Sequence, residues 1–256
     1  MIDSTKLFSR VLACAMFGLF AVPASVQAEG GWDWFVAPYL WMSDVSADLK
    51  VRDRDLEISE SFSDVLDKLD LAYQFHLEGV NGQFGFFGDY TYIRLGDKTS
   101  QGLLTLDSEM TTWITELAGV YRPSGRFDGI QAFAGLRYLK VDQRMKIKGE
   151  LELPIEPAPS VRLDESFTDF MIGLRYLGNF SESWFYSLRG DWAGGDTEGT
   201  WNLVGSVGWR FPAWENGSLI VGYRYMDMEL QDKAQGTRVS MDMTMNGPYL
   251  GLGIAF

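Results

Sequence analysis

Apolar and polar residues alternate with a period of two along most of the chain beyond residue 30. The alternation is sharp in residues 184–191, where Trp184 and Leu188 share one face and Arg189 and Asp191 share the other. Half-apolar segments of this kind are typical of β-strands. We expect about ten strands, near 34–50, 71–80, 84–96, 105–121, 129–150, 160–178, 184–194, 199–211, 218–231 and 238–256.

The connections between these segments differ at the two ends of the strands. Short turns carrying signals such as Asn81-Gly82 and Asn216-Gly217 follow strands 2, 4, 6 and 8, whereas strands 1, 3, 5 and 9 precede longer, more charged loops. An even strand count with this asymmetry is typical of outer-membrane barrels. We therefore predict an all-β fold over residues 29–256. It is an up-and-down antiparallel transmembrane β-barrel of about ten strands (roughly 8–12), with both termini periplasmic.

A soluble barrel also alternates, but its charged face would be a solvated surface rich in lysine. Here the cations on the polar face are arginines, and the lysines fall in loops or at strand ends. Arginine suits a confined polar interior because its planar fork pairs with carboxylates bidentately. Trp and Tyr also mark the strand ends, as they do at a membrane interface. The pattern therefore favours the membrane barrel.

The first 28 residues have the features of a cleaved signal peptide. Lys6 and Arg10 provide a positive start, an uncharged run follows from Val11 to Val22, and Val26-Gln27-Ala28 is a small-residue cleavage site. The run is too short for a membrane-spanning helix. We expect export to the cell outer membrane, with the single Cys (Cys14) removed and no disulfides formed.

Composition excludes several classes of partner. The net charge of −13 and a pI near 4.5 argue against nucleic acid, which requires a basic face. One Cys and one His exclude a Cys/His zinc site, so we expect neither a metal nor a cofactor.

Three segments and the last strand carry a resemblance to known proteins. These are 34–41 (WFVAPYLW), 61–70 (SFSDVLDKLD), 86–90 (FFGDY) and the alternating last strand that ends in Phe256. Together they resemble a group of uncharacterised proteobacterial outer-membrane β-barrels. The resemblance to this group implies location and fold only. The last strand by itself resembles the C-terminal signature of outer-membrane proteins, which implies that the strand ending at Phe256 is read by the barrel-assembly machinery.

The polar faces of the strands define a candidate lumen network in which charges nearly balance. A ten-stranded barrel has a narrow interior. The network is therefore interpreted either as an ion-paired plug that holds the barrel closed, or as the lining of a narrow polar conduit. Its members are His76, Glu78, Asp89, Glu116, Arg137, Asp169, Arg175, Arg189, Asp191, Arg210 and Arg224.

His76 and Glu78 lie two residues apart, so both are expected to point into the lumen. Such a pair resembles a base oriented by an acid. However, outer-membrane lipid enzymes reach their substrate from rims or outer faces, whereas His76 is expected near mid-membrane. We therefore predict that the protein is not an enzyme, with a lipid-active enzyme using His76 as the least favoured hypothesis.

The long first loop, Ser43 to Asp70, is expected to be acidic and to contain one short helix. Acids outnumber bases there by nine to four. Phe62, Val65, Leu66 and Leu69 recur at helical spacing, with Ser61 or Ser63 placed to cap. This helix either packs on the barrel rim or acts as a lid over the outer mouth. Strand 129–150 is longer than a membrane requires, which predicts an outward-projecting hairpin with a Pro-rich tip at 154–159.

Two functions remain open at this point. The first is a narrow or gated channel for small solutes, and the second is a closed structural or surface-interaction barrel without transport. The expected surroundings are outer-membrane lipid and lipopolysaccharide. The sequence does not predict the oligomeric state.

Overall fold

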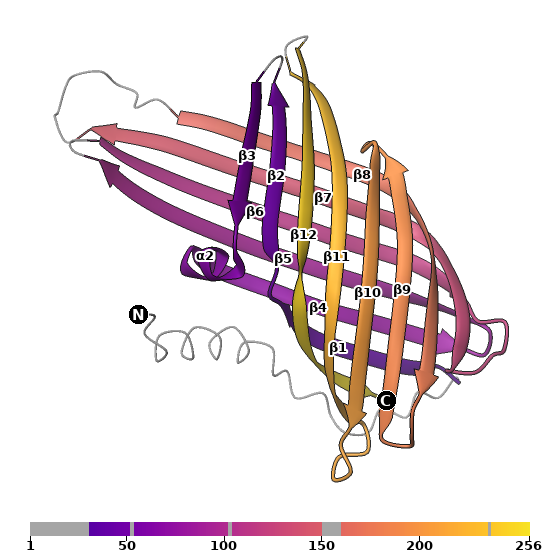
Figure 1. The fold of residues 1–256 in the computed structure, drawn as a ribbon. Coiled ribbons are helices and arrows are strands. Elements are labelled where there is room, and N and C mark those ends of the chain that lie inside the picture. Colours follow the sequence, from indigo (N-terminus) through magenta and orange to yellow (C-terminus); the bar gives the residue numbers. More distant parts are fainter. Residues whose placement is uncertain (1–30, 52–53, 102–103, 150–159, 235–236) are drawn as a thin grey trace.

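The computed structural model describes residues 31–51, 54–101, 104–149, 160–234 and 237–256 (Figure 1). The predicted signal peptide and the Pro-rich hairpin tip lie outside the described residues. The described chain consists of strands and one short helix, α2 (Phe62–Asp67). The strands are β1 (Asp33–Trp41), β2 (Asp44–Val51), β3 (Arg54–Glu60), β4 (Leu69–Asn81), β5 (Phe84–Gln101), β6 (Leu104–Tyr121), β7 (Gly129–Gly149), β8 (Ser160–Asn179), β9 (Trp184–Gly195), β10 (Gly199–Arg210), β11 (Gly217–Ala234) and β12 (Thr237–Ala255).

The strands form a closed antiparallel barrel. Strands β4 to β12 pair in sequence order, and β1 pairs with both β4 and β12, which closes the ring. Strands β1 and β2 both lie along β12, so together they form one position in the wall. In the described chain this wall has ten strands, which confirms the predicted up-and-down barrel.

The expected first strand, 34–50, is wrong in one respect, because it breaks at Met42 and Ser43. The break lies opposite Gly247, where an added Cβ would meet the backbone oxygen of Met42 at 2.0 Å. The close approach of the two backbones requires glycine at this position. Beyond the break, β2 continues along β12 and returns as β3. Much of the acidic stretch expected as a loop is therefore a β-hairpin.

β1 and β4 are paired along only part of their length. Their pairing ends at Pro38 and Phe75, and the lower part of the seam is continuous from there to Asp33 and Val80. Above it β1 follows β12, while β4 continues along β5. Proline has no N–H to donate, so it cannot extend the ladder on that side. The helix α2 lies between β3 and β4, and it packs against β2 and β3 (Figure 1).

The two ends of the barrel differ in height. Short turns join the strands at one end, where both described ends of the chain also lie. At the other end β9 and β10 stop near Gly195 and Gly199, level with Asp169 and Glu229. Strands β8 and β11 run further. The wall therefore continues as two separate sheets, β5–β8 and β11–β12–β2–β3, which diverge in Figure 1.

The outer face of the barrel carries a broad apolar band. A water-exposed apolar surface this large marks a membrane or a binding surface. Aromatic rings pair along both margins, with Trp184 against Trp209 at the short-turn end and Tyr92 against Trp113 at the other. Members of the band are Tyr73, Phe75, Leu117, Ile130, Leu136, Phe170, Ile172, Leu174, Leu188, Leu203, Val221, Tyr223 and Leu250, all exposed.

The polarity of the two faces inverts above this band, as β11 shows. Within the band Tyr223 and Tyr225 are exposed and Arg224 is buried. Two residues further on, Asp227 and Glu229 take the outer face and Met226 and Met228 take the inner one. The projecting sheets therefore have a polar outside and an apolar inside, like the two halves of a β-sandwich.

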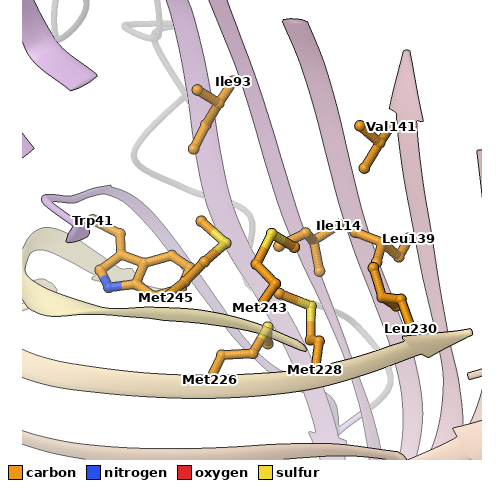
Figure 2. Close-up of a cluster of buried hydrophobic side chains, with 10 residues drawn as sticks. All are labelled: Trp41, Ile93, Ile114, Leu139, Val141, Met226, Met228, Leu230, Met243 and Met245. Carbon is orange, nitrogen blue, oxygen red and sulfur yellow. The ribbon is translucent and has the colours of Figure 1, made fainter. Parts of the chain in front are cut away.

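The main hydrophobic core lies between these two sheets. Figure 2 shows its members, which come from β5–β7, from β11–β12 and, for Trp41, from the end of β1. They are Trp41, Ile93, Ile114, Leu139, Val141, Met226, Met228, Leu230, Met243 and Met245, each 9% exposed or less. We call this cluster the apolar layer. It lies directly above the charged residues of the barrel interior.

Candidate functional site

Glu116 is at the centre of the charged residues inside the barrel. Its carboxylate, which is fully buried, accepts hydrogen bonds from three arginines on three other strands. Arg137 Nη2 lies 2.8 Å from Oε1, Arg189 Nη2 lies 2.7 Å from Oε2, and Arg224 Nη2 lies 3.2 Å from Oε1. A buried carboxylate is stable only when it is paired and hydrogen-bonded. Glu116 thus ties β6 to β7, β9 and β11.

Asp191 is the second buried acid of this group. It accepts hydrogen bonds from Arg137, from Arg189 Nε at 2.8 Å and from Asn202 Nδ2 at 2.8 Å. Arg189 and Arg137 each bridge Asp191 and Glu116. The four side chains therefore form a closed ring of charge-assisted hydrogen bonds across the barrel.

A second part of the network lies nearer the short-turn end. Arg175 donates to both oxygens of Glu78, at 2.7 and 2.6 Å, and also to Gln131 Oε1. His76 lies between two acids, with Nε2 3.4 Å from Glu78 and Nδ1 3.3 Å from Asp89. Asp89 also accepts from Tyr39 at 2.7 Å and lies 3.6 Å from Arg224. These contacts connect the two parts.

Two residues expected in the lumen network have other partners. Asp169 is buried, but it accepts hydrogen bonds from Thr197 N at 3.0 Å and Oγ1 at 2.7 Å, which fixes the β9–β10 turn. Arg210 is the last residue of β10 and donates to Glu182 O and Asn179 Oδ1 in the β8–β9 turn. Strand alternation predicted the face of Arg210 but not its height. The structure places it outside the network.

We call the remaining nine residues, together with Gln131 and Asn202, the charged layer. They are His76, Glu78, Asp89, Glu116, Arg137, Arg175, Arg189, Asp191 and Arg224. Aromatic rings pack against its arginines. Arg189 lies over Phe87 at 4.9 Å and over Phe133 at 5.0 Å from the ring centroids. Both Phe87 and Phe133 were missed in the sequence, although Phe87 shares its strand face with Asp89.

The apolar layer was also missed. The sequence pattern assigned apolar strand residues to the lipid-facing side, and this assignment holds only within the apolar band. The available signal was the change of phase in β11, where Asp227 and Glu229 take over the positions held by Tyr223 and Tyr225. In β11 the acidic residues, more than the apolar ones, mark the position of the inversion.

Within the charged layer, the polar contacts of His76 are with acids. Both ring nitrogens of His76 face carboxylates, so neither is directed at a hydroxyl or thiol nucleophile.

Among the described residues, no group of three or more His, Cys, Asp and Glu side chains is placed to hold a metal ion. No helix in the described part of the chain is long and apolar enough to span a membrane.

The expected helix at 61–70 is present and shorter, as α2. Ser61 caps it: its hydroxyl accepts from Asp64 N, and the Asp64 carboxylate accepts from Ser61 N at 3.1 Å. The Ser61 hydroxyl also donates to the Asp64 carboxylate at 2.6 Å, and this bond together with the one from Ser61 N holds the pKa of the Asp64 carboxyl below its usual value of 3.8. Val65 and Leu66 are buried, Phe62 is half-buried, and Leu69 packs against the apolar layer. The helix thus lies between the end of β3 and the start of β4.

The fold is similar to those of several solved membrane barrels. Ail of Yersinia pestis aligns over 88% of this chain and 99% of its own, with 13% identity and a TM-score of 0.37. The protease OmpT of Escherichia coli aligns over 88% and 97%, with 7% identity and a TM-score of 0.46. OprG of Pseudomonas aeruginosa aligns over 88% and 96%, with 13% identity and a TM-score of 0.34. No protein-family model matches the chain, and no curated protein matches its sequence.

Proposed function

We propose that this chain is a closed outer-membrane β-barrel that displays two projecting sheets at the cell surface and conducts no solute. Membrane placement is supported by the exposed apolar band and by its two aromatic margins. On β9 the margins at Trp184 and Trp192 bound nine residues, which is what a tilted strand needs to cross the hydrocarbon core. In water such a band would be a strong liability.

The observation that carries the closed state is the Glu116 cluster. One fully buried carboxylate accepts from three arginines on three different strands, so ion-paired side chains extend across the barrel interior at this level, which supports a closed state. The apolar layer lies on the outer side of this cluster. Met226 is 0% and Met228 is 1% exposed. An ion crossing the barrel would have to break the ion pairs and then enter a hydrocarbon environment, and both steps are costly.

The strand lengths support a role at the surface. β7 has 21 residues and β8 has 20, about twice the length needed to span the membrane. The additional residues build sheets with a polar outer face, on which Lys140 pairs with Asp164 at 3.0 Å. We infer that contacts with lipopolysaccharide and with extracellular partners occur on this face.

Cysteine labelling tests the placement and the orientation. The predicted mature chain contains no cysteine, so single variants report one site each. We expect Glu229→Cys, on the outer face above the band, to react with an impermeant maleimide on intact cells. Ser124→Cys, in the β6–β7 turn, should react only after permeabilisation. The reverse labelling pattern, or labelling of both variants on intact cells, contradicts the proposed placement.

Proteoliposome swelling tests the closed state. Vesicles containing the folded protein should swell in small sugars no faster than protein-free vesicles. Sugar-dependent swelling of the wild-type protein would overturn the closed barrel.

A gated channel is the second candidate. The end of the backbone pairing between β1 and β4 at Pro38 favours it. In the described structure these strands are not paired above Pro38, and α2 lies beside the resulting seam. Deletion of residues 60–69 should then let small solutes through, because it removes α2 and the contact of Leu69 with the apolar layer. Unchanged permeability after this deletion would contradict a channel gated by α2.

We propose that the protein has no enzymatic activity. Hydrolysis of lipid esters by the purified protein, lost in a folded His76→Ala variant, would contradict this.

A further inference from the structure

Four methionine side chains meet on one face of two neighbouring strands. Met226 of β11 is the register partner of Met245 of β12, and Met228 is the register partner of Met243. Directly opposed side chains in an antiparallel pair have Cβ atoms about 4.5–5.5 Å apart. All four are buried, with exposed fractions of 0% to 4%. Figure 2 shows their thioethers turned into the same cluster.

The choice of methionine here is not explained by packing alone. The opposing wall of the same layer uses branched aliphatic residues, Ile93, Ile114, Leu139 and Val141. Strands favour β-branched residues, and burying methionine costs more side-chain entropy than burying isoleucine or leucine. Yet five of the chain's 11 methionines fall within residues 226–245, in the patterns Met-x-Met and Met-x-Met-x-Met. The thioethers are concentrated on one wall.

The charge beneath this cluster is balanced among its acids and arginines. In the charged layer four carboxylates face four guanidinium groups. The acids are Glu78, Asp89, Glu116 and Asp191, and the bases are Arg137, Arg175, Arg189 and Arg224. A cation in the adjacent layer would therefore keep its full charge there, which favours a monovalent ion over a divalent one.

We propose that Met226, Met228, Met243 and Met245 form a binding site for a soft monovalent cation, Cu(I) or Ag(I). Thioether sulfur is a soft, uncharged ligand that selects Cu(I) over the harder divalent ions. The expectation of no metal site considered only Cys, His and carboxylate ligands, so it does not address this one.

The fold provides a route to the site from outside. Above Gly195 and Gly199 no described strand joins the β8 edge to the β11 edge. The sheets that enclose the methionines are therefore held together there by side-chain packing, which can loosen without breaking backbone pairs. Methionine side chains are flexible enough to rearrange around an ion.

Titration with silver nitrate in chloride-free buffer tests the site. We expect the folded barrel to bind one Ag(I) by calorimetry. The double variant Met228→Leu/Met243→Leu should bind at least tenfold more weakly, because leucine preserves volume but removes two sulfurs. Met171→Leu is the matched control, since Met171 is equally buried but belongs to another cluster, and it should bind as the wild type does. Wild-type affinity should also be unchanged between about pH 5 and 8, because thioethers do not titrate, unlike His or Cys ligands.

NMR of the methionine ε-methyl groups gives a second readout on the unaltered protein. Ag(I) should shift the signals of Met226, Met228, Met243 and Met245 and leave that of Met171 in place. The proposal is overturned if the wild-type protein binds no Ag(I), or if the folded double variant binds within twofold of wild type. It is also overturned if the shifts fall on other methionines. Folding of each variant is verified by heat-dependent gel mobility.

Discussion

At the residue scale, the charged layer shows which contacts strand alternation predicts and which it does not. Alternation predicted the inward face of Arg189 and Asp191, and the two side chains lie 2.8 Å apart inside the barrel. It did not predict that Arg189 also reaches Glu116, 73 residues earlier in the chain, because that contact depends on barrel closure. Height along the strand was the missing quantity for Arg210 as well.

Arg189→Ala is expected to lower the stability of the barrel. The substitution leaves Glu116 and Asp191 each with one fewer buried cation, and breaking a buried pair costs about 3 kcal/mol. The measurement is the thermal unfolding midpoint of the refolded protein in detergent. Arg126→Ala removes the exposed pair with Asp128 and serves as the control, with an effect below about 1 kcal/mol. Equal midpoints for Arg189→Ala and wild type would refute the structural role of the charged layer.

At the element scale, the strands were predictable where turn residues mark their ends. The expected segments 84–96, 184–194 and 199–211 correspond to β5, β9 and β10, because Gly and Asn turns flank them. β3 was missed, since its seven residues include four charged ones and lie within an acidic stretch. The break between β1 and β2 was also missed. It is set by Gly247 on a strand about 200 residues away, and a local pattern contains no such information.

Gly247→Ala tests the break between β1 and β2. The new Cβ would lie 2.0 Å from the backbone oxygen of Met42, which cannot move as a side chain can. We expect a loss of about 1–3 kcal/mol in unfolding free energy, as found for overpacked sites. Gly119→Ala in β6 is the control, because its nearest neighbour would be 3.9 Å away, and its effect should stay within about 0.5 kcal/mol. Equal effects of the two substitutions would show that the close approach is not required.

Acid should loosen α2. Hydrogen bonds from the Ser61 hydroxyl and backbone N–H keep the pKa of the Asp64 carboxyl below its usual 3.8. A depressed pKa means that the carboxylate stabilises the helix at pH values above 3.8. This stabilisation is lost as the pH falls through the lower, folded-state pKa. Amide hydrogen exchange in α2, corrected for intrinsic rates, should therefore accelerate below about pH 4.

Two carboxylate variants separate this effect from general acid unfolding. Asp64→Asn should reduce protection of α2 at neutral pH and abolish its acid dependence, whereas Asp67→Asn should retain that dependence. If Asp64→Asn keeps the acid dependence of the wild type, the capping box is not its cause.

At the scale of the whole molecule, one inversion of polarity organises the structure. Within the apolar band the interior is charged and the exterior apolar, and in the projecting sheets the arrangement is reversed. The sequence contains both patterns, but alternation alone assigns two faces without saying which medium each one contacts. The closed barrel and its strand count could be predicted. The apolar layer could not be predicted, because it forms between β11–β12 and β5–β7, which are distant in sequence.

The most direct test of the closed barrel is single-channel recording of the refolded mature protein in planar bilayers. Heat-dependent gel mobility first establishes that the inserted protein is folded. The charged layer and the apolar layer together predict a silent bilayer at voltages that leave the membrane intact. Discrete, ion-selective conductance steps from the wild-type protein would contradict this account and make Glu116 and its arginines the lining of a pore.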